Sequence, residues 1–190
     1  MKKVTLAVSG DRGSFSEEAG LLYASRVGME SELIFATDME RVLSKVEGGE
    51  AGLGIFPVVN SLGGLVRPAF DAMGRHLFTV IDELVMEVNQ CLMALPGVGK
   101  EAVTEIASHS QALKQCERYL ESAFPGIPLV EWEDTAKAAK DLTEGKLPGT
   151  AAVIAPARSA ALYGLALLES GIQDRRPNLT TFIVVKNHEA

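Results

Sequence analysis

The chain has 190 residues, of which 47% are hydrophobic and 23% are charged, and its formal net charge at pH 7 is −7. This composition is typical of a globular protein with one domain or two small lobes, and the acidic charge argues against a nucleic-acid or anionic-membrane partner. No stretch reaches the roughly 18 apolar residues of a membrane span, and the first apolar run is too short for a signal peptide.

Alternating strand and helix patterns along the chain predict an α/β fold. The predicted strands cover residues 4–8, 33–36, 52–57, 80–95, 103–107, 129–132, 151–155 and 179–185. The predicted helices cover residues 14–24, 37–47, 108–124, 135–143 and 156–163, and most end near a glycine or before a proline. The run over 80–95 is long enough to be one strand that passes between two lobes.

Three of these helices begin at a pattern typical of a capping box, in which a hydroxyl residue precedes an acidic residue or glutamine by three positions. The pairs are Ser14 with Glu17, Thr37 with Glu40, and Ser108 with Gln111. The N–H groups at a helix start attract anions, so Ser14 and Ser108 are candidates for ligand contacts. Plain helix capping explains the same two serines equally well.

One predicted strand ends at Pro57 and is followed at once by short polar side chains and glycines. Asn60 and Ser61 stand where the chain must turn, and Gly63 and Gly64 come next. Open α/β sheets build ligand sites at strand ends of this kind, and glycine lets the backbone come close to a small molecule. An ordinary strand-to-loop turn is the alternative interpretation.

Two parts of the chain repeat the same order of features. Residues 38–57 and 134–156 both run from an acidic cap through a helix to a small-residue strand and a proline. Any βαβ unit shares these features, so the repeat is weak evidence for a duplication. It favours two α/β lobes with a cleft between them.

The cysteines and histidines give no sign of a metal site. Cys91 and Cys116 have neither the spacing of a zinc site nor that of a redox motif, and the 3 histidines are scattered. Two thiols without such spacing are typical of a reducing compartment. We therefore expect a cytoplasmic protein with no metal ion and no cofactor.

Six short motifs, in the same order along the chain, resemble those of the prephenate dehydratase family. They are residues 10–19 (GDRGSFSEEA), 57–64 (PVVNSLGG), 108–116 (SHSQALKQC), 135–139 (TAKAA), 151–165 (AAVIA with YGL) and 172–180 (IQDRRPNLT). The resemblance spans essentially the whole chain. It implies the conversion of prephenate to phenylpyruvate in phenylalanine biosynthesis.

The resemblance also implies a fold and its partners. The fold would be α/β and two-lobed, of the periplasmic-binding-protein (type II) kind, with a substrate cleft between the lobes. Lobe 1 is expected over about residues 1–78 with part of the C-terminal segment, and lobe 2 over about residues 79–165. Family members usually continue into a regulatory domain that binds phenylalanine, and we expect none here. The expected partners are the dicarboxylate prephenate and, because catalytic lobes of the family commonly pair, a second copy in a homodimer.

Particular residues receive implied roles. Thr180 begins the motif most tied to catalysis in the family, and it is the first choice for a hydroxyl that contacts the leaving oxygen. Asn60 and Gln111 are implied as neutral orienting groups, and Ser61 and Ser14 as anion contacts. The full implied substrate-binding set is Asn60, Ser61, Gln111, Ser14, Gly63 and Ser108. Without the resemblance, Thr180 is an ordinary residue of a β-branched strand.

The chain departs from the family pattern at three positions. Val59 replaces the carboxylate before Asn60, and Thr181 replaces the arginine after Thr180. Gln90 replaces the histidine that usually precedes Cys-Leu. We expect the lost charges to weaken the reaction. We also expect that they were lost as an ion pair, on the assumption that positions 59 and 181 meet across the cleft.

These departures keep three functions open. The leading one is dehydration of prephenate with decarboxylation, without feedback by phenylalanine. The second is decarboxylation of prephenate without loss of the hydroxyl, or action on a related cyclohexadienyl acid. The third is a non-catalytic module that binds or senses prephenate. Val59 and Thr181 favour the second and third, whereas the retained Thr180 is compatible with all three.

Overall fold

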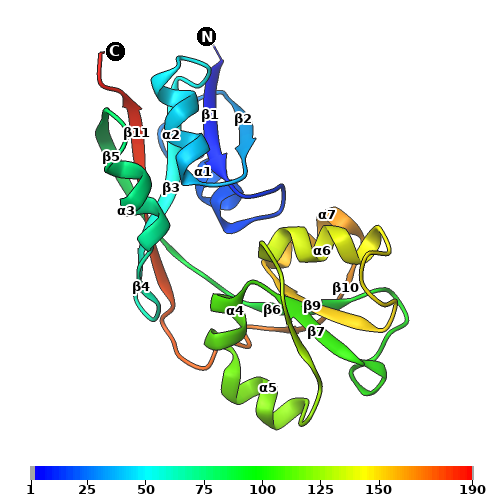
Figure 1. Ribbon diagram of the computed structural model, residues 1–190. Helices are drawn as coiled ribbons and strands as arrows, with labels where there is room; N and C mark the ends of the chain where they lie inside the picture. Colours follow the sequence, from blue (N-terminus) through cyan, green and yellow to red (C-terminus); the bar gives the residue numbers. More distant parts are fainter. Residues whose placement is uncertain (1–2, 190) are drawn as a thin grey trace. The chain divides into compact units, whose positions relative to one another are not determined.

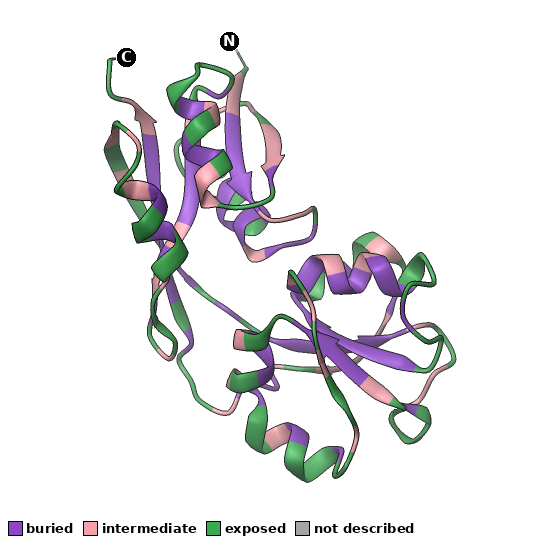
Figure 2. Cartoon of the chain, viewed as in Figure 1, coloured by how far each residue is buried: buried purple, intermediate pink, exposed green. Residues whose placement is uncertain are grey.

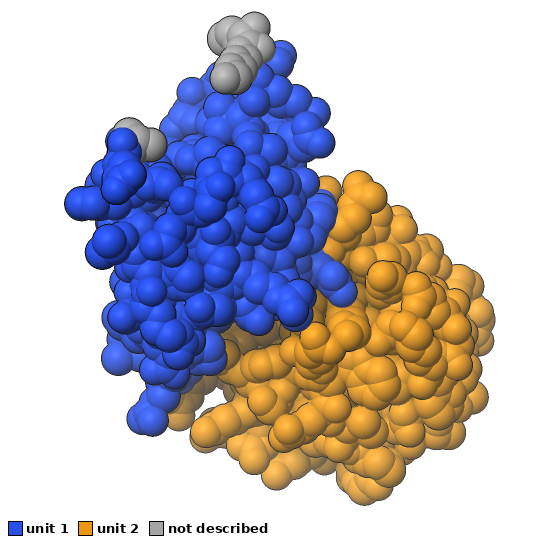
Figure 3. Space-filling view, turned by 45° about the horizontal axis from the view of Figure 1, so that its top comes forward, with its two compact units in different colours: residues 1–11, 15–87, 179–190 blue, residues 12–14, 88–178 orange. Residues whose placement is uncertain are grey.

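The structure, a computed structural model, describes residues 3–189 and divides into two compact units (Figures 1 and 3). Unit 1 comprises residues 1–11, 15–87 and 179–190, and unit 2 comprises residues 12–14 and 88–178. The division after residue 87 lies beyond the boundary expected near residue 79. The reason is that the strand over Phe78–Glu87 pairs along its length within the sheet of unit 1.

Unit 1 contains a mixed sheet in the order β2-β1-β3-β11-β5, with β4 added beside β3. Its strands are β1 (Val4–Ser9), β2 (Ser31–Ala36), β3 (Leu53–Asn60), β4 (Gly64–Leu65), β5 (Phe78–Glu87) and β11 (Leu179–Asn187). β1 runs parallel to β2 and β3, whereas β11 runs antiparallel to β3 and β5. The last strand of the chain therefore lies between two strands of the N-terminal part (Figure 1).

Helices cover both faces of this sheet. They are α1 (Phe15–Arg26), α2 (Met39–Glu47) and α3 (Arg67–Met73). α1 packs with Leu6, Ile55 and Phe182 on one face, which we call the α1 face. α2 and α3 pack with Phe56 and Val185 on the other, the α2–α3 face. Burying apolar side chains on both faces stabilises the three-layered unit (Figure 2).

Unit 2 contains a second mixed sheet, in the order β10-β6-β9-β7-β8. Its strands are β6 (Cys91–Ala94), β7 (Glu105–Ser108), β8 (Leu129–Glu131), β9 (Ala151–Ala155) and β10 (Ala166–Ser170). Its helices are η1 (Lys100–Ala102), α4 (Ser110–Gln115), α5 (Glu117–Ala123), α6 (Thr135–Thr143) and α7 (Ala157–Tyr163). α6 and α7 pack on one face and α4 and α5 on the other. β9 is buried at every residue, as befits a strand covered on both faces.

The prediction of one strand over residues 80–95 is wrong, because the structure has two strands, β5 and β6, in different sheets. Between these two strands, the backbone of Gln90 hydrogen-bonds to the segment that precedes β11 and does not pair with a neighbouring strand. Its backbone N–H donates to Gln173 Oε1 at 3.0 Å, and its carbonyl accepts from Ile172 N at 3.0 Å. The short elements α3, β4 and β10 were not predicted, and α3 lacks any side-chain cap that could have marked its start.

Two of the three predicted capping boxes are wrong. α2 is capped by Asp38, whose Oδ1 accepts from Arg41 N at 2.8 Å, while Thr37 Oγ1 accepts from the Arg41 side chain. α4 begins after His109, whose Nδ1 accepts from a backbone N–H of the first turn at 3.2 Å. Ser108 is the last residue of β7 and so stands one position too early to cap. In both cases the residue next in the chain carries the better-placed acceptor.

A cluster of charged side chains joins α2 to the chain that follows α3. The ring of His76 lies with Nδ1 at 2.6 Å from Glu47 Oε2 and Nε2 at 2.7 Å from Glu40 Oε1. Arg75 donates from Nε and Nη2 to Glu40 Oε2. Both ring nitrogens face carboxylates, so the doubly protonated ring is favoured. Burial lowers the pKa of His76, but the hydrogen bonds with Glu47 and Glu40 outweigh it and raise the pKa above 6.5.

We expect the free energy of unfolding to fall as the pH rises through this raised pKa, because folded His76 binds its proton more tightly than the unfolded chain does. The contribution is fully present below pH 6.5 and is lost above the folded pKa. At the acid end, hydrogen bonds from His76 lower the pKa of Glu40 and of Glu47. Their contribution is therefore present above pH 4.5 and lost as the pH falls through the folded pKa values.

Denaturant unfolding of the wild type and of His76→Gln, between about pH 6 and pH 9, measures the alkaline part of this effect. The difference in unfolding free energy between the two proteins should shrink steadily across this range. A difference independent of pH would contradict the assignment.

Candidate functional site

The turn after β3 is built around the side chain of Asn60, which is 5% exposed. Its Oδ1 accepts from the backbone N–H groups of Leu62 at 2.9 Å and Gly63 at 2.7 Å, a local arrangement that asparagine commonly makes. Its Nδ2 donates to Thr180 Oγ1 at 2.9 Å and to Leu179 O at 3.3 Å. One amide therefore holds both the turn and the start of β11.

Thr180 lies directly opposite Asn60 in the antiparallel pairing of β3 with β11 and is 6% exposed. Because Asn60 Nδ2 donates to Thr180 Oγ1, the threonine oxygen acts as an acceptor in this contact. A hydroxyl has a single O–H donor, so the proton of Thr180 must point away from Asn60. The pair therefore presents an oriented hydroxyl donor.

Ser61 holds the same strand end through its backbone and its side chain. Its N–H donates to Leu179 O at 2.8 Å, and its Oγ accepts from Leu179 N at 2.9 Å. Gly63, another predicted contact, gives its N–H to Asn60 Oδ1. Four of the predicted residues, Asn60, Ser61, Gly63 and Thr180, are thus brought together within unit 1.

The other three predicted residues belong to unit 2. Ser108 is completely buried, and its hydroxyl donates to Ile154 O on β9 at 2.6 Å, which ties β7 to its neighbour. Gln111 is half-buried in the first turn of α4. Ser14 is 4% exposed and directly precedes α1. Their contacts with a substrate stay predictions.

The segment over residues 12–14 is held against α7. Ser159 Oγ donates to Gly13 O at 3.0 Å, and the Tyr163 hydroxyl donates to Arg12 O at 2.7 Å. Gly13 has φ +89°, and a Cβ there would lie 2.7 Å from Ser159 Oγ. Only glycine meets both conditions without strain. The fold therefore explains why glycine stands at position 13 of the motif over residues 10–19.

The two positions that lack the family's charges are direct neighbours in one sheet. Thr181 pairs with Val59 on β3 and with Val85 on β5, and Val59 pairs with Leu65 on β4. Paired residues project to the same face of a sheet, so these four side chains form one row across four strands. The assumption that positions 59 and 181 meet across a cleft is wrong, because the β3–β11 register places both inside unit 1.

This row projects away from the candidate site. Val59 packs on the α2–α3 face, whereas Phe182 packs on the α1 face. Successive residues of a strand project to opposite faces, so Thr180 shares the face of Phe182, and Thr181 shares that of Val59. Charged side chains at positions 59 and 181 would therefore project to the α2–α3 face, whereas Thr180 projects to the α1 face.

We expect Val59→Glu to destabilise the protein more than Val59→Glu combined with Thr181→Arg, because the double variant gives the new carboxylate a cross-strand partner. A fully buried unpaired charge costs about 3–5 kcal/mol. Position 59 is only half-buried, so the partner should recover about 1 kcal/mol of unfolding free energy. Denaturant unfolding of both single variants and the double variant completes the cycle. Additive effects would contradict the pairing.

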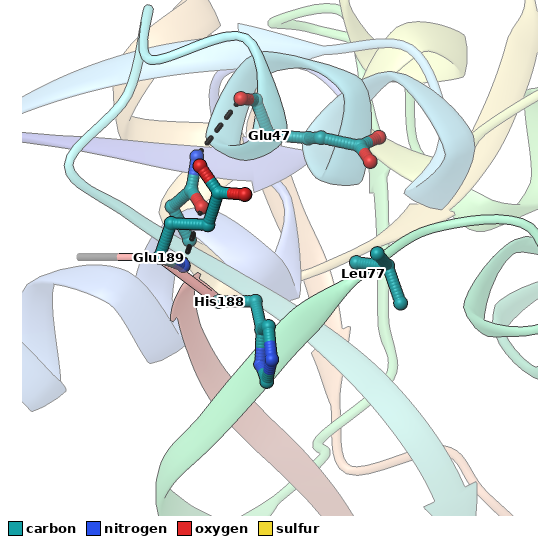
Figure 4. A pocket seen from close by; sticks show the side chains of 5 residues that line it. Glu47, Leu77, His188 and Glu189 are labelled. Atoms are coloured by element: carbon teal, nitrogen blue, oxygen red, sulfur yellow. Dashed lines mark hydrogen bonds between the residues drawn. The ribbon is translucent and has the colours of Figure 1, made fainter.

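A cavity of about 150 Å³ lies elsewhere in unit 1 and is lined by Glu47, Leu77, Asn187, His188 and Glu189 (Figure 4). Asn187 ties β11 to the end of α2, since its Nδ2 donates to Glu47 O at 2.9 Å. The cavity includes none of the predicted site residues.

Within residues 3–189, no three His, Cys, Asp or Glu side chains are placed together so as to hold a metal ion. In the same part of the chain, every helix is too short or too polar to cross a membrane.

Sequence reasoning did not single out Gln115 and Asn178, whose side chains hydrogen-bond to each other at 3.0 Å. The usable signal was their position inside two of the six motifs, over residues 108–116 and 172–180.

The family model described as prephenate dehydratase matches residues 6–190. The chain is 38% identical over 180 residues to arogenate dehydratase/prephenate dehydratase 6 of Arabidopsis thaliana and to arogenate dehydratase 1 of Petunia hybrida. These alignments cover 95% of this chain but only 42% and 41% of those proteins, so the chain spans about two fifths of their length.

Solved structures with a similar fold also match the chain. A prephenate dehydratase from Arthrobacter aurescens, in complex with L-Phe, matches with a TM-score of 0.87 and 29% identity, over 97% of this chain and 60% of that one. A periplasmic substrate-binding protein of an ABC transporter from Coxiella burnetii matches with a TM-score of 0.52 and 15% identity, over 98% and 85% of the two chains. The second likeness shows the fold alone. The predicted α/β fold of the periplasmic-binding-protein kind is confirmed.

Proposed function

Because the chain belongs to the prephenate dehydratase family, we propose that it removes carbon dioxide and water from prephenate to give phenylpyruvate. The observation that carries this proposal is the 2.9 Å hydrogen bond from Asn60 Nδ2 to Thr180 Oγ1. This hydrogen bond orients the hydroxyl of Thr180 as a donor, and Thr180 is the first catalytic candidate by resemblance to the family motif.

The reaction requires a hydrogen-bond donor at the oxygen of the leaving ring hydroxyl. The ring carboxylate leaves as carbon dioxide, and the electron pair of its C–C bond becomes a ring double bond. The C–O bond to the ring hydroxyl breaks at the same time, the hydroxyl takes up one proton and leaves as water, and the ring becomes aromatic. Stabilising the leaving oxygen with a positioned donor lowers this barrier.

Thr180 supplies that donor in the proposed mechanism. Its hydroxyl is uncharged, so it contributes a directed hydrogen bond, and the proton that the reaction consumes comes from solvent. Asn60 acts as a positioning residue, because its Nδ2 occupies the acceptor side of the Thr180 oxygen.

The remaining candidates bind the rest of the substrate in this proposal. Ser14 and Ser61 contact the two carboxylates, and Gln111 and Gly63 orient the molecule. The completely buried hydroxyl of Ser108 donates to Ile154 O, so in this proposal Ser108 positions the start of α4 and with it Gln111. The proposal also includes a homodimer and a cytoplasmic location.

Arogenate is a second candidate substrate, because the curated relatives at 38% identity are named as arogenate dehydratases. Arogenate carries an ammonium group where prephenate carries a keto oxygen, and the ring chemistry is the same. Its product is phenylalanine instead of phenylpyruvate.

The test is to give purified protein prephenate at neutral pH and to measure phenylpyruvate through its enol absorbance in base, with arogenate in parallel and phenylalanine as the readout. Aromatic product that depends on Thr180 supports the proposal. Carbon dioxide released with a non-aromatic product would replace it by the decarboxylase function. Substrate that binds but is recovered unchanged would replace it by the sensing function.

A further inference from the structure

Five residues with side-chain amides are joined by hydrogen bonds in unit 2, one of which uses the backbone N–H of Gln90, and we call them the amide cluster. They are Asn89, Gln90, Gln115, Gln173 and Asn178. Gln115 Oε1 accepts from Gln90 Nε2 at 3.1 Å and from Asn178 Nδ2 at 3.0 Å. Gln173 Oε1 accepts from Gln90 N at 3.0 Å, and Gln173 Nε2 donates to Asn89 Oδ1 at 3.0 Å.

One atom of the amide cluster stands out. Gln90 Oε1 is buried and receives no hydrogen bond from the part of the chain that the structure describes. Gln90 is 4% exposed, and its N–H, its carbonyl and its Nε2 all have partners. A buried acceptor without a donor is rare and costly, so one that is retained calls for an explanation.

The orientation of this amide follows from its neighbours. Inverting it would set Gln90 Oε1 against Gln115 Oε1, which also accepts from Asn178. Two oxygens would then face each other without a proton between them. The amide cluster therefore holds Gln90 with its nitrogen toward Gln115, and its oxygen is left without a donor from the described residues.

The amide cluster adjoins residues of the proposed site along the chain. Gln115 follows Gln111 by one turn of α4, so the two side chains project from the same side of the helix. Asn178 stands two residues before Thr180, and its carbonyl accepts from Val88 N at 2.7 Å. These links along the chain are the reason for assigning the donor of Gln90 Oε1 to the substrate.

We propose that Gln90 determines substrate specificity, with its Oε1 accepting a hydrogen bond from the ammonium group of an amino-acid substrate. The inference rests on the proposed function and deepens it, because it concerns the choice between arogenate and prephenate. An ammonium group has N–H donors and no acceptor, whereas a keto oxygen is only an acceptor. A site with a buried acceptor favours the ligand that supplies the donor and rejects the analogue that lacks it.

The test compares kcat/KM for arogenate and for prephenate in the wild type, Gln90→Met and Asn89→Ala. Methionine keeps the length of the side chain and removes the amide. We expect Gln90→Met to lower the arogenate value about tenfold or more and to change the prephenate value less than about threefold. Asn89→Ala alters an exposed member of the amide cluster and should leave the ratio unchanged. Equal ratios in the wild type and Gln90→Met would overturn the inference.

Failure of the proposed function can be told apart from failure of this inference. If the wild type turns over neither substrate, the proposed function fails. The inference about Gln90 is then tested by the Kd values of arogenate and prephenate, measured by calorimetry. A preference for arogenate that is lost in Gln90→Met supports it. An unchanged preference, or no binding of either compound, overturns it. The Tm of substrate-free Gln90→Met should equal or exceed that of the wild type, and Gln90→Leu replaces this variant if it does not fold.

Discussion

Thr180→Val is expected to lower kcat by about 10²- to 10³-fold with little change in KM, because it removes the donor for the leaving oxygen and keeps the shape of the side chain. The same change takes away the partner that Asn60 Nδ2 reaches at 2.9 Å, but Leu179 O stays within 3.3 Å of that nitrogen. The free energy of unfolding should therefore fall by only about 1 kcal/mol. Steady-state kinetics and denaturant unfolding measure the two effects separately.

Thr180→Ser is the matched control. Serine keeps the hydroxyl and the acceptor for Asn60, so its kcat should stay within about tenfold of the wild type. If the valine and serine variants were equally active, the hydroxyl would have no part in the reaction, and the mechanism proposed for Thr180 would fall.

Asn60→Asp should cost kcat/KM about 10²-fold, although the two side chains have nearly the same shape. The new carboxylate can still accept from Leu62 N and Gly63 N, so the turn is kept. It has no proton to give to Thr180 Oγ1, so the threonine hydroxyl donates to the carboxylate and turns its proton away from the substrate. The added negative charge also disfavours a dicarboxylate substrate.

The pH dependence separates this effect from a purely structural one. As the pH falls toward the pKa of the new carboxyl group, its protonated form regains a donor for Thr180. The activity of Asn60→Asp relative to the wild type should therefore recover at acid pH, while its Tm at neutral pH stays close to that of the wild type. Wild-type activity at neutral pH would contradict the orientation assigned to the hydroxyl.

The missing charges at positions 59 and 181 have a different meaning once the register is known. From the sequence, their loss suggests a weakened reaction, since they flank Asn60 and Thr180. Alternation along the strands sends Val59 and Thr181 to the α2–α3 face, opposite the face of the candidate hydroxyl. The two positions therefore lie in the row with Leu65 and Val85, on the face opposite Thr180, and Thr180 keeps its partner Asn60.

Several elements could be predicted from local patterns alone. The helix over Thr135–Thr143 and the strand over Ala151–Ala155 lie where the sequence predicts them. Both are set by signals within a few residues, namely the aspartate cap and the apolar stripe of the helix, and the continuous apolar run of the strand. The α/β class follows from the same signals, because elements of this kind alternate along the whole chain.

The candidate residues could also be named from the amino-acid sequence, whereas the contacts between them depend on the fold. Asn60 and Thr180 are 120 positions apart, and their contact exists because β11 returns to pair with β3 in a fixed register. A pairing of this range has no local signature, and a slip of one residue would have turned Thr180 to the other face. The break at Gln90 was hidden for the same reason. Its partners Gln115 and Gln173 lie far along the chain, and only the folded unit brings their amides together.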